Sequence, residues 1–246
     1  MGVAKLFIAV SAIFFAGLNL ARAGAEGSVI TWGNPSNIAG DSDVLNDGTT
    51  VAAFNMNGSA VTVNGVPFNS WTYSSPSTAT TMGNFTFAES PNHILAGSGF
   101  GSNNNPFASL SVNYQTLLST GITTDDNNTL TLTITNLVPL QKYEFQFWVS
   151  ASDLPSPAFT TVASAPNNVT LHPNTSDADG GVGQFVVGTF TAADPTEVIT
   201  FNGSDSTQAP LVNAFQLRAV PEPAASSILL LGGSVLLLLR RRPAAK

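Results

Sequence analysis

The chain of 246 residues has no cysteine and few basic residues. Without cysteine it cannot form a disulfide, use a thiolate nucleophile or bind zinc through thiolates. Between Gly24 and Ala219 the only basic residues are Lys142 and Arg218, against fourteen acidic ones, so this stretch has a formal charge of −12. Phosphate binding needs clustered lysine and arginine, and we therefore exclude nucleic acid as a partner.

Residue patterns typical of catalysis are also absent. The sequence has no Gly-x-Ser-x-Gly elbow, no His-Glu-x-x-His pair and no phosphate-binding loop, and its two histidines, His93 and His172, lie in proline-containing turns. A glycoside hydrolase would need two carboxyl groups about 5 to 10 Å apart, which local sequence spacing does not reveal. Glu144 is the best single candidate for such a carboxyl group. We predict that the protein is not an enzyme.

Residues 1–23 have the three parts of a secretory signal peptide. Lys5 precedes an apolar stretch from Leu6 to Gly17, and the small-residue site Ala21-Arg22-Ala23 follows it. We expect cleavage after Ala23, with Ala23-Gly24-Ala25 as the alternative site two residues later, and export of the remaining chain.

The stretch from Gly24 to Ala219 is expected to be rich in β-strands. Short alternating segments are separated at close intervals by Gly, Pro, Asn and Asp. The expected strands are 28–32, 50–54, 60–68, 84–87, 130–135, 143–150, 184–192, 197–201 and 213–220, and residues 109–119 are the one expected helix. This pattern predicts an all-β fold, and we favour a single jelly-roll or galactose-binding-like β-sandwich over residues 24–219. Two tandem smaller sandwiches are the alternative, although no internal repeat supports them.

A short link between two of these strands resembles a known turn. The segment Leu137-Val138-Pro139-Leu140-Gln141-Lys142-Tyr143 is similar to the tyrosine corner of fibronectin type III domains and related sandwiches. That resemblance implies that the Tyr143 hydroxyl bonds to the backbone of the turn.

One strand carries a candidate sugar-binding group. In residues 143–150, Glu144, Gln146 and Trp148 alternate with an apolar stripe and should share the opposite face. An indole beside hydrogen-bonding side chains can stack on a pyranose, so we take these three residues as the candidate carbohydrate site. If both faces of the strand are covered, Trp148 is instead a core residue.

Two acidic loops are candidates for a structural calcium ion, the only cofactor that we consider. Asp177-Ala178-Asp179-Gly180 and the segment from Asp41 to Gly48 both concentrate oxygen ligands in tight turns. Neither matches an EF-hand, and plain acidic turns are the alternative. We prefer the first loop, with Asp177 and Asp179 as ligands.

The end of the chain, residues 220–246, has its own organisation. Pro221-Glu222-Pro223 precedes an apolar run at 224–239, and Arg240, Arg241 and Arg242 follow that run. Sixteen residues make a helix of about 24 Å, short for a permanent membrane anchor. The arginines would stay on the cytoplasmic side and leave the body outside.

The tail and the signal peptide together resemble the PEP-CTERM sorting signal. That resemblance implies a membrane-bound precursor whose tail is recognised by an exosortase, a membrane-embedded cysteine peptidase, during delivery to the cell surface or extracellular matrix. The expected partners are therefore the exosortase-type enzyme, the membrane transiently, and extracellular polysaccharide. We predict a non-enzymatic surface protein whose body is structural or polysaccharide-associated. A dedicated carbohydrate-binding module is the first alternative and a glycoside hydrolase the second.

Overall fold

The computed structural model describes residues 28–90, 93–125, 129–153, 161–204 and 208–221. The predicted signal peptide lies outside these residues. So does the sorting signal, apart from Val220 and Pro221.

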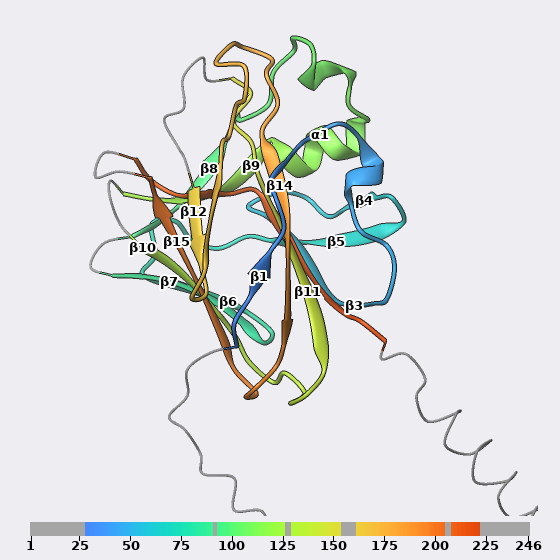
Figure 1. Ribbon diagram of the computed structural model, residues 1–246. Helices are drawn as coiled ribbons and strands as arrows, with labels where there is room; N and C mark the ends of the chain where they lie inside the picture. The colour runs from blue at the N-terminus through green and yellow to red at the C-terminus, as the bar shows by residue number, and fades with distance from the viewer. Residues whose placement is uncertain (1–27, 91–92, 126–128, 154–160, 205–207, 222–246) are drawn as a thin grey trace, which may run out of the picture.

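The described residues form an all-β structure with two large sheets (Figure 1). The larger sheet has eight strands in the order β1-β14-β11-β17-β3-β5-β4, with β2 also paired to β14. These strands are β1 (Thr31–Trp32), β2 (Ser36–Asn37), β3 (Thr49–Met56), β4 (Val61–Val63), β5 (Val66–Trp71), β11 (Lys142–Val149), β14 (Gln184–Thr191) and β17 (Ala214–Ala219). Since the sheet joins strands from both halves of the chain, two tandem sandwiches do not describe this body.

The second large sheet has six strands in the order β13-β12-β15-β10-β7-β6. They are β6 (Ala79–Met82), β7 (Phe85–Ser90), β10 (Thr129–Ile134), β12 (Thr161–Ser164), β13 (Asn168–Leu171) and β15 (Glu197–Gly203). A small third sheet has the order β16-β9-β8, formed by β16 (Leu211–Val212), β9 (Thr120–Thr124) and β8 (Ile94–Ser98).

The main hydrophobic core lies between the two large sheets. In β10 the predicted alternation is confirmed, because Leu130, Leu132 and Ile134 are fully buried while the intervening threonines are only partly covered. Across the core, Phe147 of β11 meets Phe201 of β15 with ring centroids 5.2 Å apart. The two sheets therefore pack as a β-sandwich, as expected from the sequence.

A second apolar cluster lies on the other face of the larger sheet. It is covered by the helix α1 (Val112–Leu118), whose N-cap residue Ser111 accepts a hydrogen bond from the Tyr114 amide. The 3-10 turn η1 (Asp41–Asp43) lies beside this helix, and a second turn, η2 (Phe107–Ser109), precedes it. The predicted helix is confirmed, and it makes part of the larger sheet buried on both faces.

One expected strand is two strands in the structure. Residues 60–68 were expected to run straight, but they contain the hairpin β4–β5, which turns at Asn64 and Gly65 with φ values of 49° and 77°. Asn-Gly is the preferred pair for such a two-residue turn, so this signal was in the sequence. Several short strands, including β6, β8, β9, β12 and β13, were also not expected.

The tyrosine corner is confirmed. The Val138 amide donates to the Tyr143 hydroxyl at 3.0 Å, and the ring of Tyr143 stacks on Phe190 with centroids 5.5 Å apart. This contact fixes the turn between β10 and β11.

Both ends of the described chain leave from the same end of the sandwich (Figure 1). Near the start, the Ala193 amide donates to the Ser28 hydroxyl. Near the last described residue, the Val220 amide donates to the Lys142 carbonyl at 2.9 Å. The helix α1 lies toward the opposite end (Figure 1).

Candidate functional site

The predicted sugar-stacking tryptophan is buried, so that prediction is wrong. Trp148 has no exposed surface and packs between Phe68, at a centroid distance of 5.6 Å, and Phe185, at 6.4 Å. Its indole nitrogen donates to the Tyr114 hydroxyl at 2.8 Å. The face was identified correctly, but α1 covers it, and the indole cannot reach a ligand.

Gln146 is also unsuitable as a ligand-binding residue. It is fully buried, its carbonyl oxygen accepts from the Leu45 amide and from Gln216, and its amide nitrogen donates to the Asp43 carbonyl. Glu144 remains partly exposed opposite Arg218. Partial burial, followed by the nearby charge of Asp47, raises the pKa of Glu144.

The calcium prediction remains untested. Asp179 holds its own loop to a neighbouring one, because its two carboxylate oxygens accept from the Ser102 hydroxyl at 2.5 Å and from the side-chain amide of Asn104 at 2.6 Å. Asp177 lies in the left-handed region with φ of 52°. Within the described ranges, no group of three or more His, Cys, Asp or Glu side chains is arranged to hold a metal ion.

The outer face of the six-stranded sheet is a regular surface whose side chains are partly or fully exposed. Cross-strand pairing places its side chains in rows. One such row runs across the sheet through Ala88, Thr131, Thr200, Ser164 and Asn168. We call this surface the threonine face: Ala79, Thr81, Thr86, Ala88, Thr129, Thr131, Thr133, Val162, Ser164, Asn168, Thr170, Val198, Thr200 and Asn202. None of these residues is charged, although the body as a whole is strongly acidic.

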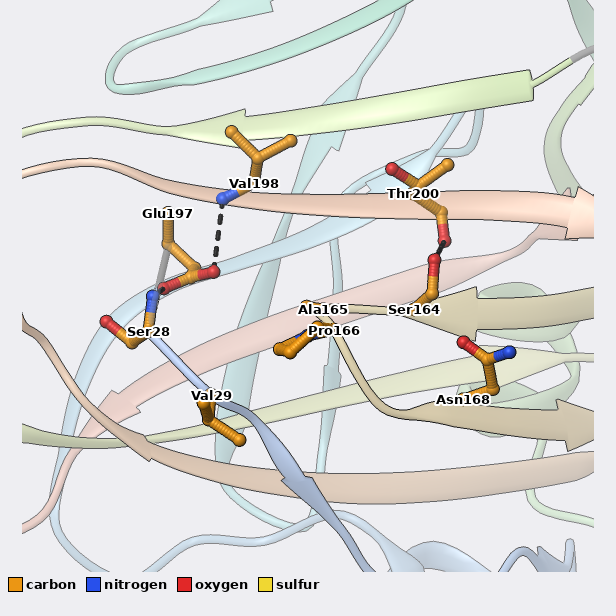
Figure 2. Close-up of a pocket in the computed structure, with 9 residues that line it drawn as sticks. All are labelled: Ser28, Val29, Ser164, Ala165, Pro166, Asn168, Glu197, Val198 and Thr200. Carbon is orange, nitrogen blue, oxygen red and sulfur yellow. Dashed lines mark hydrogen bonds between the residues drawn. The ribbon is translucent and has the colours of Figure 1, made fainter. Parts of the chain in front are cut away.

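A hollow of about 520 Å³ lies at one end of the threonine face (Figure 2). Ser164, Asn168 and Thr200 line one part of it, and Val29, Pro166 and Val198 supply an apolar part. The side chains of Asn168 and Thr200 make no hydrogen bond to other described residues and are at least partly exposed. A polyol could therefore exchange hydrogen bonds with these groups while its C–H surface packs on the apolar part.

Glu197 is the one carboxylate among the described residues that line this hollow. Its side chain is 1% exposed, and its oxygens accept from the Ser28 amide at 2.7 Å and the Val198 amide at 3.2 Å. Burial raises the pKa of Glu197, and the bonds from Ser28 and Val198 act in the opposite direction. Both oxygens thus accept backbone amides, and the one bonded to Ser28 holds that residue against β15.

Sequence reasoning missed the hollow for a clear reason. Its walls come from residues near 28, 166 and 198, which only the folded sheet brings together. The alternating threonines of residues 130–135 were visible in the sequence. The threonines that pair with them lie on strands distant in the sequence, so no sequence pattern indicated that they form one face.

Among the described residues no helix is both long and apolar enough to cross a membrane. No protein-family model matches the chain, and no curated protein matches it. One solved structure, described as "Structural basis for the promiscuous specificity of the carbohydrate-binding modules from the beta-sandwich super family", is 12% identical, and the match covers 74% of this chain and 96% of that one with a TM-score of 0.17. A TM-score this low does not establish a shared fold.

Proposed function

We propose that the protein is a non-enzymatic, exported surface protein whose body binds neutral extracellular polysaccharide. The observation that carries the binding role is the threonine face with its hollow. The face is hydroxyl-rich and has no charged side chain, on a body with a formal charge of −12. The one carboxylate among the described lining residues of the hollow, Glu197, is buried and accepts two backbone amides. An acidic polysaccharide would be repelled by such a body, whereas a neutral one would not.

The two ends of the sequence support the delivery route. Residues 1–23 read as a signal peptide, and residues 220–246 read as a PEP-CTERM signal for an exosortase-type enzyme. The last described strand, β17, ends at Ala219, and Pro221-Glu222-Pro223 follows one residue later in the sequence. Pro221 is exposed, which suits recognition by a membrane enzyme. We keep the jelly-roll or galactose-binding-like topology as part of this proposal.

The hydrolase alternative has less support. A glycosidase needs two carboxyl groups across its cleft. Glu197 is the single carboxylate among the described lining residues, and both of its oxygens already accept backbone amides. Glu144 lies on the larger sheet, away from this hollow.

Binding can be tested with the exported protein on immobilised neutral and acidic polysaccharides. Thr200→Val keeps the shape and the strand propensity but removes the hydroxyl, and Asn168→Ala removes the amide. Each change should weaken binding to neutral polysaccharide about fivefold, the worth of one hydrogen bond. Thr189→Val on the larger sheet is the matched control and should leave binding unchanged. No binding to any neutral polysaccharide, or equal effects of all three variants, would refute the proposed role.

Delivery needs a separate measurement. The intact mass of the surface-located protein should lack Met1 to Ala23 and Arg240 to Lys246. A surface form that keeps the three arginines would contradict tail processing without affecting the binding proposal.

A further inference from the structure

Two apolar side chains of one tight loop project from the end of the sandwich where the chain leaves. Val138 and Leu140, between β10 and β11, are 61% and 76% exposed. Val29, 60% exposed, lies at the same end and lines a hollow together with Lys142. Exposed valine or leucine is ordinary when scattered, but here the residues gather at one end.

The backbone of this loop presents Leu140 in a conformation that leucine rarely adopts. Its φ is 69°, while the other four non-glycine residues with positive φ in the described chain are asparagine or aspartate. Short polar side chains tolerate this region and bulky ones do not. The Leu140 amide donates to the Ala192 carbonyl at 2.8 Å, and the tyrosine corner holds Val138. The backbone of the loop thus holds the Leu140 side chain outward, although burial in the body does not stabilise it there.

The chain leaves the body beside this loop. The Gln141 side-chain amide donates to the Val220 carbonyl at 2.7 Å, and the Val220 amide donates to the Lys142 carbonyl. Only Glu222 and Pro223 separate the exposed Pro221 from Ala224, where the apolar run of the tail begins. The three residue-to-residue steps from Pro221 to Ala224 span at most about 10 Å. If the run enters a membrane, this end of the sandwich must lie against it.

The distribution of charge agrees with that orientation. Both basic residues of the body, the exposed Lys142 and the buried Arg218, belong to this end, where the acidic residues are Asp47, Glu144, Asp194 and the buried Glu197. The opposite end, by contrast, carries acidic loops without lysine or arginine among the described residues. Its histidines are His172 and His93, and His93 lies 3.5 Å from Asp125. These loops contain Asp125, Asp153, Asp177 and Asp179. Anionic lipid headgroups would repel the opposite end more strongly.

We propose that this end is a lipid-contacting surface, with Val138 and Leu140 entering the headgroup boundary and Lys142 beside lipid phosphates. The inference rests on the proposed insertion of the tail, which supplies the tether. Two side chains alone bind a bilayer weakly, since stable anchoring needs a second signal. The contact should therefore last while the tail is attached and end when the tail is removed, which frees the body to reach extracellular polymer.

The absence of cysteine makes a direct test available. Single variants Leu140→Cys, Val112→Cys and Leu236→Cys each accept one environment-sensitive fluorophore, in the exported, membrane-bound chain reconstituted in phosphatidylcholine vesicles containing phosphatidylglycerol. Val112 is the matched control, because it is 76% exposed and belongs to α1 at the far end. We expect a blue shift and quenching by a lipid-borne quencher at positions 140 and 236, and neither at 112.

The outcomes separate the two proposals. Quenching at 236 without quenching at 140 would overturn the lipid-contacting surface and leave tail insertion standing. Absence of quenching at both positions would overturn tail insertion and the contact with it. A second variant, Leu140→Asn, suits the positive φ and should fold at least as stably. With a label at Val138→Cys, Leu140→Asn should cause loss of the lipid quenching. Unchanged quenching in that variant would also count against the contact.

Discussion

The indole nitrogen of Trp148 donates a hydrogen bond to the hydroxyl of Tyr114 at 2.8 Å, which joins strand β11 to helix α1. The same hydroxyl donates to a carboxylate oxygen of Asp43 at 3.2 Å, and that oxygen also accepts the amides of Ala39 and Gly40. One buried hydroxyl therefore connects the sheet, the helix and the segment at 39–43. Burial, with the nearby charge of Asp43 adding to it, raises the pKa of Tyr114, so its proton stays in place.

Tyr114→Phe should destabilise the fold by about 1–3 kcal/mol, because it leaves the buried indole N–H without an acceptor. Tyr73→Phe is the matched control. The Tyr73 hydroxyl is buried and has no hydrogen-bond partner among the described residues. Its removal should cost nothing or give a small gain, since no bond is lost. Urea unfolding of both variants measures the difference, and equal losses would argue against the proposed role of Tyr114.

Trp148→Ala should reduce stability by about 3–5 kcal/mol, as expected for a fully buried tryptophan, and should leave glycan affinity of the folded protein unchanged. Thr200→Val should do the reverse, weakening polysaccharide binding with little effect on stability. Denaturant unfolding and binding measured on the same samples would check this pair. Loss of glycan binding by folded Trp148→Ala would restore the original sugar-stacking hypothesis.

Arg218→Met should destabilise the body by at least about 2 kcal/mol, because several acceptors lose a charged donor. The guanidinium donates to the carbonyls of Asp47 and Gly48 and to the Thr50 hydroxyl, and it is 3% exposed. Arg218→Lys should recover only part of the loss, since one ammonium cannot span these acceptors. Amide hydrogen exchange should report faster opening of residues 47–50 in both variants. Full recovery with lysine would contradict this account.

Glu197 should make stability depend on pH. Its pKa is raised in the folded state above the ordinary 4.5, so the folded protein binds its proton more tightly than the unfolded chain. The stabilisation is therefore complete below about pH 4.5 and declines as the pH rises through the folded pKa. Comparing wild type with Glu197→Gln isolates this group from the general repulsion of the acidic body. The wild type should gain stability relative to the variant on acidification from neutral pH, and a constant difference would refute the effect.

If the loop at 177–180 holds calcium, added Ca²⁺ should raise the melting temperature, and above the Kd the rise should follow the logarithm of the Ca²⁺ concentration. Asp177→Asn should abolish the rise, because one anionic ligand is lost. Asp47→Asn, in the other candidate loop, should leave the rise intact, and loss of the rise in that variant instead would assign the calcium ion to the segment from Asp41 to Gly48. No rise in melting temperature with Ca²⁺ would leave Asp179 as a loop-joining residue only.

Local sequence was sufficient for several features of the fold. Strict alternation in residues 130–135 and 143–150 predicted strands and the residues that share each face, and the Leu-x-Pro-x-x-x-Tyr link predicted the bond between Val138 and Tyr143. The bond of the tyrosine corner joins residues that are close in the sequence. The alternation follows from the two-residue period that the pleat of a strand imposes. The short strands β6 and β12 were missed because their sequences carry little apolar alternation and depend on neighbouring strands for pairing.

What the sequence by itself determined is the all-β class, the tyrosine corner, the helix near residue 112 and the residues that share each face of a strand. Only the tertiary structure decided which faces are covered. Trp148 is core because a helix more than thirty residues away packs on it, and Leu140 is exposed because nothing does. The threonine face and its hollow were likewise assembled from strands distant in sequence. Alternation is a local property of the backbone, whereas burial depends on long-range packing that no single segment encodes.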